Sequence, residues 1–421
     1  MEINLKDFLS VSDSIHLDTE AFQSAINQLS QSGGGKLIVP AGKYYIGTVQ
    51  LKSNITLELL SGAEIYGSKN LEDYYVNGYV HNELGEVLSL FYAINEENIC
   101  VFGNGSIHFN GSSFMNWNEI FKYTIPRDNH TQEELEETVV QNIERPNQPI
   151  FFHNCSNITF SGISLIDASC WTLTFSECNI VKVIGITINN HMRIPNNDGI
   201  HITASCDVII SNCQITCGDD CIAITCITNW DVVCRNITVS NCVLKSRSAG
   251  VRCGHRESKV KNVILNNLVI SETNRGICMF VGENAFVEDV IVSDIIIHSK
   301  MVAGAWWGNG EAIMICGANS NGHINNVIMS NVIAYASNGV VVIGENNIKN
   351  VIFKNWRLTI LNDIRRDKFD KGFDLLPLPC ISRPNNEIID VYIKNADVSI
   401  SDFLSCSEDD QNRNVLNYGK K

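Results

Sequence analysis

The sequence has little positive charge and no long apolar run. Lys and Arg number 31 against 46 Asp and Glu, which gives a net charge of -15. This balance argues against nucleic acid and against an anionic membrane surface as partners. No stretch of about 18 apolar residues is present, so no transmembrane helix is predicted. Residues 1–7 lack the basic-then-apolar layout of a secretion signal, and we expect a cytoplasmic protein.

The sequence also lacks any pair of cysteines in CxxC spacing, although it contains 16 cysteines. A metal site is therefore disfavoured, and no cofactor is implied. Many cysteines sit inside apolar, strand-like runs: Cys206, Cys213, Cys221, Cys234, Cys242 and Cys253. In a chain of this length we interpret most of them as small buried hydrophobic residues of a protein from a reducing compartment.

Helical patterns are scarce. Apolar residues at Phe22, Ala25, Ile26 and Leu29 predict one amphipathic helix over residues 19–29, which ends before the glycines at 33–35. Short strands separated by turns follow from Lys36 onward. Residues 1–45 are therefore expected to form a helical N-terminal cap.

A phrase that begins with Asn or Asp and continues with three strand-forming residues recurs along the chain. It starts at Asn98, Asn157, Asp207, Asn236, Asn262, Asp289, Asn326, Asn350 and Asp390. The turn residues that close these phrases mostly follow one another at intervals near 23–29 residues: Gly162, Gly185, Asn212, Asn241, Asn267, Asp294, Asn331, Asn355 and Asn395. This drifting period predicts an all-β parallel β-solenoid with apolar stacks inside and asparagine ladders at the turns.

A β-sandwich and a β-propeller are the competing all-β folds. The strand-like runs are more uniformly apolar than the alternating strands of a sandwich, and no fixed blade motif of a propeller is present. Residues 117–149 do not fit the repeat and predict an inserted loop with a short acidic helix near residues 133–137. Residues 402–421 predict a loose polar tail. Neither break resembles a domain boundary, so a single domain over residues 1–421 is expected.

Three carboxylates form the strongest candidate site. Asp198 lies in Asn-Asn-Asp-Gly, and Asp219 and Asp220 follow it by 21 and 22 residues in Gly-Asp-Asp-Cys. One coil of the predicted solenoid would stack the three acids on one face. Carboxylates crowded in this way acquire separated pKa values, which lets one site hold a general acid and a general base. Two solvated turns that happen to carry Asp are the alternative.

These motifs and their surroundings resemble the polygalacturonase-type enzymes of glycoside hydrolase family 28. The resemblance is carried by residues 196–199, by Gly218–Cys221, and by cap segments that include Val39-Pro40-Ala41-Gly42-Lys43-Tyr44. It implies a right-handed parallel β-helix and inverting hydrolysis of a glycosidic bond. It also implies that Asp219 is the general acid and that Asp198 and Asp220 hold and activate the attacking water.

The sequence departs from the family pattern at two places. Ala249 stands where the resemblance implies a histidine, and Cys278-Met279-Phe280 stands where it implies the Arg-x-Lys that grips a uronate carboxylate. Other polar residues nearby are candidates for substrate binding: His201, Arg252, His255 and Arg275. For each of them a solvated or coil-stacking role is the alternative.

A tryptophan pair supplies the last candidates. Trp306 and Trp307 are followed by Glu311, and indole faces stack well on sugar rings while a carboxylate accepts from hydroxyls. The alternative is a pair that caps an insertion.

Together these features predict a glycosidase that acts, from the chain end, on a pectin-derived or related oligosaccharide. A lyase or an epimerase on the same scaffold, or a non-catalytic carbohydrate-binding solenoid, are the alternative hypotheses. The sequence predicts no oligomeric state.

Overall fold

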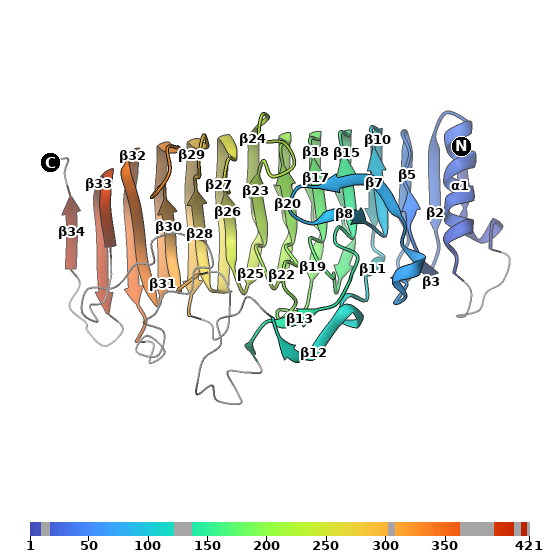
Figure 1. The fold of residues 1–421 in the computed structure, drawn as a ribbon, viewed down its shortest axis with the longest axis horizontal. Helices are drawn as coiled ribbons and strands as arrows, with labels where there is room; N and C mark the ends of the chain where they lie inside the picture. The colour runs from blue at the N-terminus through green and yellow to red at the C-terminus, as the bar shows by residue number, and fades with distance from the viewer. Residues whose placement is uncertain (10–16, 122–136, 302–307, 363–390, 408–413, 419–421) are drawn as a thin grey trace.

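In the computed structural model the chain is a parallel β-helix, whose coils are stacked along the long axis of the molecule (Figure 1). The structure describes residues 1–9, 17–121, 137–301, 308–362, 391–407 and, for the backbone only, 414–418. Helix α1 (Thr19–Gln31) covers the N-terminal end of the stack, and it buries the four apolar residues that predicted it. The predicted helical cap and parallel solenoid are therefore confirmed.

Each coil contributes strands to three parallel columns. The first column contains β1 (Glu2–Asn4), β2 (Gly35–Val39), β5 (Ile55–Leu59), β10 (Glu97–Gly103), β15 (Ser156–Ser161), β18 (Asn179–Ile184), β21 (Cys206–Ser211), β24 (Val233–Ser240), β27 (Lys259–Thr273), β29 (Phe286–Ser299), β31 (His323–Ala336), β32 (Asn338–Ile360) and β33 (Val391–Ser407). The second contains β3 (Gly42–Ile46), β6 (Ala63–Gly67), β11 (Ser106–His108), β16 (Ser164–Ile166), β19 (Thr187–Asn189), β22 (Gln214–Cys217) and β25 (Val243–Ser246). The third contains β4 (Val49–Gln50), β9 (Phe91–Ile94), β14 (Ile150–His153), β17 (Leu173–Ser176), β20 (Ile200–Thr203), β23 (Ile222–Thr225), β26 (Ala249–Cys253), β28 (Arg275–Phe280) and β30 (Glu311–Cys316), and the first residues of β32 and β33 continue it.

The turns between the first two columns explain the sequence repeat. Asn267, Asp294 and Asn331 have φ values of 52°, 59° and 57°, a left-handed conformation that Asn and Asp adopt more readily than other side chains. Their side chains also join successive coils, since Asn331 donates to Asp294 at 3.0 Å and Asn355 donates to Asn331 at 2.8 Å. Two requirements thus select Asn or Asp at this turn position: the left-handed backbone conformation, and the side-chain hydrogen bonds between stacked coils. The predicted asparagine ladders are confirmed.

The core is a continuous stack of inward Val, Ile, Leu, Phe and Cys side chains. Most of the cysteines are buried in it, and all fifteen cysteines of the described chain are free thiols. The predicted role of these cysteines as small buried residues is confirmed. From β27 onward the first two columns are spanned by single long strands, because β27 pairs with both β24 and β25.

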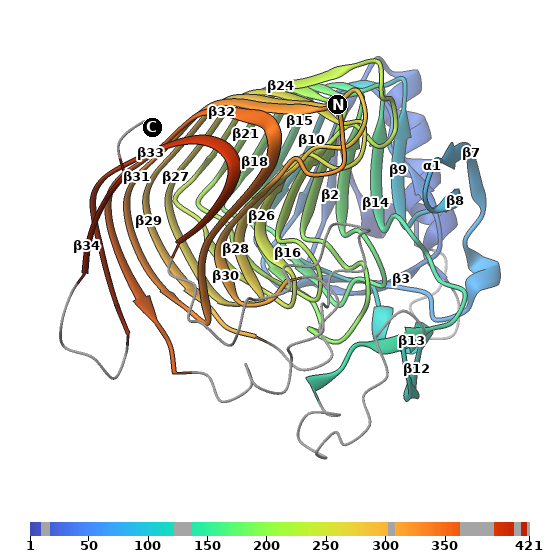
Figure 2. The ribbon, with the colours of Figure 1, turned by 60° about the vertical axis from the view of Figure 1, so that its left-hand side comes forward.

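Two antiparallel hairpins project from the stack (Figure 2). One is formed by β7 (Val76–His81) and β8 (Gly85–Leu88), and the other by β12 (Met115–Ile120) and β13 (Val140–Asn142). The second hairpin belongs to the predicted insertion at 117–149, whose predicted acidic helix lies almost entirely outside the described residues. Short 3-10 turns cover Leu5–Asp7, Leu71–Asp73 and Gly111–Phe114. Residues 402–407 and 414–418, predicted as a loose tail, are instead strand residues of β33 and of β34 (Asn414–Tyr418).

Candidate active site

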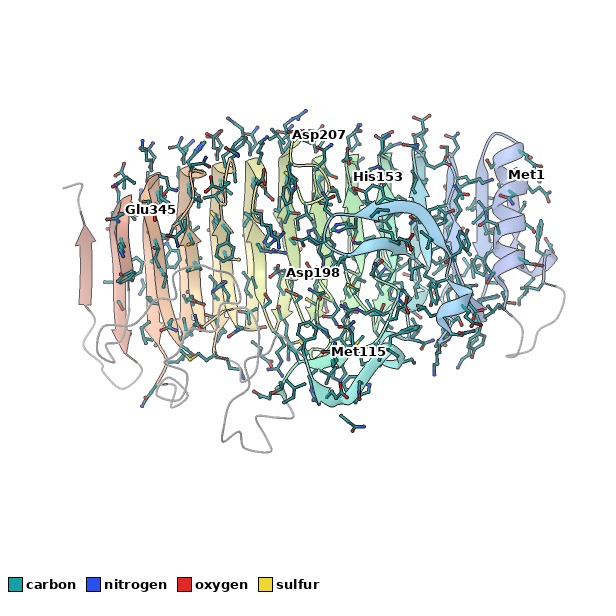
Figure 3. All side chains as sticks on the ribbon, viewed as in Figure 1. Met1, Met115, His153, Asp198, Asp207 and Glu345 are labelled. Carbon is teal, nitrogen blue, oxygen red and sulfur yellow. The ribbon has the colours of Figure 1, made fainter. Side chains whose placement is uncertain are left out.

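The three aspartates lie on two adjacent coils, in the loops that lead into β20 and β23. Ile200 pairs with Ile222, and Gly199 N donates to the Asp220 carbonyl at 2.9 Å. Asp198 is therefore opposite Asp220, one coil apart, as the motif spacing predicted. Figure 3 shows Asp198 near the middle of the stack.

The two loops approach each other closely because of two glycines and one asparagine. A Cβ on Gly199 would lie 2.5 Å from the Cys221 carbonyl oxygen, so only glycine fits between the coils. Asn197, which is fully buried, accepts a hydrogen bond from Gly218 N at 2.5 Å through its side-chain oxygen. The Asn-Asn-Asp-Gly segment thus holds the Gly-Asp-Asp-Cys turn in place.

The Asp220 carboxyl group is held in place by donors of the next coil. Its Oδ1 accepts from Ser248 Oγ at 2.9 Å and from Ala249 N at 3.2 Å, and its Oδ2 forms an ion pair with Arg252 Nε. Charge-assisted contacts of this kind fix geometry well because they are stronger than neutral hydrogen bonds. Ser248 and Ala249 thus supply donors at the position where a histidine was expected.

Asp198 is almost fully buried and has no hydrogen-bond donor within the described chain. Its Oδ2 lies 3.2 Å from His201 Nδ1 and 3.9 Å from an Arg252 terminal nitrogen. Burial raises its pKa well above the ordinary value, and the neighbouring charges of Asp219 and Asp220 raise it further, while Arg252 opposes them. Buried carboxyl oxygens without donors at the floor of a pocket are typical of catalytic groups.

Asp219 is also buried, with 4% exposure. Burial raises its pKa well above the ordinary value, followed by repulsion from Asp220, and Arg252 again lowers it. Its backbone is fixed because its carbonyl accepts from Ser246 Oγ and, at 2.9 Å, from Cys217 Sγ. The site therefore places two carboxyl groups with raised pKa values beside a third that is paired with Arg252, and such unequal surroundings are what acid and base catalysis requires.

His201 was predicted to bind substrate and instead lies beneath the site. It is fully buried, with its ring 3.7 Å from the Trp171 ring and its Nε2 3.0 Å from Thr225 Oγ1. Burial holds the pKa of His201 well below its ordinary value, so the ring is neutral near pH 7. The structure thus assigns His201 to the support of Asp198, because the Trp171 loop covers its outward face.

Arg252 and His255, both predicted to bind substrate, belong to one polar chain across the pocket. Arg252 donates to His255 Nδ1 at 3.1 Å, and His255 Nε2 lies 3.1 Å from the Glu83 carboxylate. Burial opposes the charge of Arg252, but Asp220, Asp198 and Asp219 raise its pKa above the ordinary value. The chain therefore anchors Arg252 from the side opposite to the aspartates.

Glu83 comes from the β7–β8 hairpin, far away in sequence. The hairpin is fixed over the third column because Asn82 donates to the Ile227 carbonyl at 2.6 Å. His255, with Arg256, lowers the pKa of Glu83 to about 2 although burial works in the opposite direction. The hairpin thus closes one side of the pocket with a charged carboxylate.

Arg275 and Glu311 form a buried pair. Arg275 Nε and Nη2 lie 3.3 and 3.2 Å from the two Glu311 carboxylate oxygens, and both residues are 1% exposed. Glu311, predicted to bind sugar hydroxyls, is therefore occupied by Arg275 and by Asn309 N at 2.7 Å. Arg275 borders the pocket, but the Glu311 carboxylate neutralises its positive charge. Trp306 and Trp307, the other predicted sugar contacts, lie outside the described residues.

These side chains enclose a pocket of about 80 Å³ above the aspartates. Its lining consists of Glu83, Trp171, Asn196, Asp198, Asp219, Asp220, Ser248, Arg252, His255, Arg275, Cys278 and Phe280. A larger cleft of about 930 Å³ adjoins it and shares Glu83 and Asn196 with it. Across the ranges that the structure describes, no cluster of three or more His, Cys, Asp or Glu side chains has a metal-binding arrangement. No helix in those ranges has the length and hydropathy needed to span a bilayer.

Six residues that line the pocket were not among the predicted site residues: Glu83, Trp171, Asn196, Ser248, Cys278 and Phe280. Glu83 and Trp171 come from irregular segments, whose paths are not specified by the coil repeat. Cys278 and Phe280 could have been found, because they lie in β28 within the segment that was inspected for a cation.

Comparison with known proteins agrees with this geometry. The model of the glycosyl hydrolases family 28 matches residues 33–363, so the chain belongs to this family. A probable polygalacturonase of Vitis vinifera is 27% identical over 338 residues, which cover 73% of this chain and 62% of the relative. A polygalacturonase of Persea americana is 24% identical and is covered over 60% of its length. The chain thus spans about three fifths of these curated relatives.

Solved structures support the fold. The exopolygalacturonase of Thermotoga maritima superposes with a TM-score of 0.68 at 20% identity, covering 97% of this chain and 90% of that one. The family 28 exopolygalacturonase of Yersinia enterocolitica gives a TM-score of 0.59 at 17% identity, with coverage of 97% and 78%. The predicted right-handed parallel β-helix is confirmed.

Proposed function

We propose that the protein is a glycosidase that hydrolyses a glycosidic bond of a pectin-derived or related oligosaccharide with inversion. The carrying observation is the group of three aspartates on two adjacent coils. Two of them have pKa values raised by burial, and the third is held in place by Arg252 and Ser248. Family membership and the polygalacturonase names of its relatives support this class of reaction.

In the proposed reaction Asp219 donates its proton to the leaving glycosidic oxygen as the C–O bond breaks. Asp198 and Asp220 orient a water on the other side of the anomeric carbon and accept one of its protons. The water oxygen forms the new bond to the anomeric carbon. The site then holds as many protons as before, and exchange with solvent returns the proton from the base to Asp219. Arg252 pairs with Asp220 and lowers the pKa of Asp198, which favours the proposed role of Asp198 as a proton acceptor.

The β7–β8 hairpin supports the proposal of cleavage from a chain end. Its Glu83 borders the pocket, and its Asn82 bonds to the loop after β23, so the hairpin obstructs passage of a polymer on that side. The two solved relatives named above are exopolygalacturonases. Fifteen free thiols support the further proposal that the enzyme works in a reducing compartment such as the cytoplasm.

The test is product analysis of pectin-derived oligosaccharides with the wild-type protein and the Asp219→Asn variant. We expect terminal sugars to be released, with NMR of the fresh product showing the inverted anomer. A product absorbing in the ultraviolet as an unsaturated uronide would show a lyase instead. The Asn variant is expected to lose at least about 10³-fold in kcat, as for removal of a general acid. Full activity of this variant would refute the assignment of Asp219.

A further inference from the structure

The catalytic pocket offers no unneutralised cation among its described lining residues. The lining includes two arginines, and each already contacts carboxylates. Arg252 is paired with Asp220 and lies near Asp198, and Arg275 is paired with Glu311 through its Nε and Nη2. His255 donates to Glu83 and accepts from Arg252, so its ring nitrogens are both occupied.

The other wall of the pocket is apolar. Strand pairing places Cys278 directly beside Arg252 on the next coil, and Phe280 follows two residues later on the same face. Both are buried, and Trp171, with 3% exposure, adds apolar lining on the hairpin side, where its ring packs against His81. Aromatic and thiol surfaces of this kind suit the C–H face of a sugar ring.

The adjoining cleft, between the two hairpins, is acidic. The acidic and basic residues of its described lining are Glu72, Glu83, Glu86, Glu144 and Arg145. The hydrogen-bond donors of Arg145 are largely occupied by groups of the protein itself. One of its terminal nitrogens donates to the carbonyls of Ser169 at 2.5 Å and Pro195 at 2.7 Å, and the other donates to Asn196 Oδ1 at 3.2 Å.

A uronate would be unfavourable in both spaces. In the pocket the uronate carboxylate would lose its contacts with water. It would face four carboxyl groups and an apolar wall, with no unpaired cation among the described lining residues. A buried charge without a partner is strongly destabilised. In the cleft it would face a surplus of glutamates. A neutral sugar meets neither difficulty, because its hydroxyls donate to carboxylates and its ring covers apolar surface.

We propose that the sugar held in the catalytic pocket is neutral, and that the acidic cleft between the hairpins binds further neutral sugar units of the same substrate. This inference rests on the proposed glycosidase function, and it narrows the substrate to glycans whose cleaved residue carries no carboxylate. Phe280 and Cys278 are then specificity residues, since they occupy the wall at which a carboxylate would require a cation.

The experiment labels the sugar that occupied the catalytic pocket. Hydrolysis leaves that sugar as a new reducing end, so borodeuteride reduction after digestion marks it with deuterium. The substrate is a pool of rhamnogalacturonan, galactan and galacturonan oligosaccharides reduced beforehand with unlabelled borohydride. Products from the wild type and from Asp219→Asn are separated by anion exchange and identified by mass spectrometry.

Three outcomes are distinguishable. Deuterium on neutral sugars, absent with Asp219→Asn, would support the inference. Deuterium mainly on galacturonic acid would overturn it and leave the glycosidase proposal standing. No new reducing ends in any arm would overturn the proposed function, and the inference would fall with it.

A variant pair tests the apolar wall directly. Phe280→Lys places a cation in the pocket, and we expect the ratio of kcat/KM for uronate over neutral substrate to rise at least about tenfold. Phe280→Met, which removes the ring without adding charge, is the matched control and should leave this ratio within about threefold of the wild type. Equal ratios in both variants would contradict a role for charge at this wall. If the Lys variant does not fold, the labelling experiment decides alone.

Discussion

Arg252 and Asp220 form an ion pair across adjacent coils, and the same guanidinium lies 3.9 Å from Asp198 on the coil before. One cation therefore contacts Asp220 and Asp198, while no ion pair between Arg252 and Asp219 is formed in the part of the chain that the structure describes, and burial raises the pKa of Asp219. The division of labour among three like side chains thus depends on where a single arginine is placed.

Removal of this arginine should change the pH profile. Arg252 lowers the pKa of both Asp198 and Asp219, so Arg252→Gln lets these carboxyls keep their protons to higher pH. We expect the acid limb of kcat/KM, which reports the base that must be ionised, to move to higher pH, with a loss of about 10²-fold at pH 7. Arg235→Gln, at an exposed position of β24, is the control. An acid limb that does not move would contradict this role of Arg252.

Asparagine in place of Asp219 should stabilise the fold. The folded-state pKa of Asp219 is raised above 3.8, so ionisation of this group destabilises the folded protein as pH rises. The free energy of unfolding of Asp219→Asn should exceed that of the wild type by about 1 kcal/mol at pH 7. The difference should shrink toward zero as pH falls to 3.8. Denaturant titrations at several pH values measure this difference in the free energy of unfolding. Asp207→Asn, on an outer turn, is the control. A stability gain that does not depend on pH would contradict the prediction.

The buried pair of Arg275 and Glu311 should behave as a unit. Glu311→Gln leaves a buried guanidinium, stacked over the Phe280 ring at 5.3 Å, without its counter-ion. We expect a loss of about 3 kcal/mol in the free energy of unfolding, and a smaller loss when Arg275→Met and Glu311→Leu are combined. Lys261→Met, which breaks the more exposed pair with Glu288 at 3.0 Å, should change stability by less than about 1 kcal/mol. Additive losses in the double variant would disprove coupling.

At Asn331 the contribution of the left-handed backbone conformation to stability can be separated from that of the side-chain hydrogen bonds. Its φ of 57° disfavours alanine, and its side chain joins Asp294 and Asn355 on the neighbouring coils. Asn331→Ala should destabilise the protein by about 2 kcal/mol, from left-handed strain plus the lost hydrogen bonds. Asn331→Gly keeps the φ without strain and should lose less. Thermal unfolding of both variants decides, and equal losses would mean that the backbone conformation is unimportant there.

Much of this fold could be predicted because it repeats. Asparagine tolerates the left-handed turn and also bonds to its copy one coil away, so the same residue returns at each coil and displays the period. Asp198 and Asp220 could be brought together for the same reason, since their spacing equals one coil. Residue spacing carries this information wherever the chain is regular.

The remainder of the site lies where the chain is irregular. Glu83 and Trp171 come from a hairpin and a loop whose paths depend on distant contacts rather than on the period. His201 was a candidate because it follows the first aspartate motif, but the Trp171 ring packs against it and removes it from the pocket surface. In the sequence Arg275 and Glu311 are two polar residues with no evident relation. They form a pair because the register of their strands places them opposite each other.

The hydrogen bond from Asn82 to Ile227 spans 145 residues, whereas the coil-to-coil pairings join segments that are close in sequence. A chain emerging from the ribosome can therefore wind its coils one after another, but the hairpin finds its anchor only after residue 227 has been made and folded. Glu83 can contact His255 only later, after residue 255 has also been synthesised. Catalytic competence should accordingly arise late in synthesis, after most of the stack beneath it is already wound.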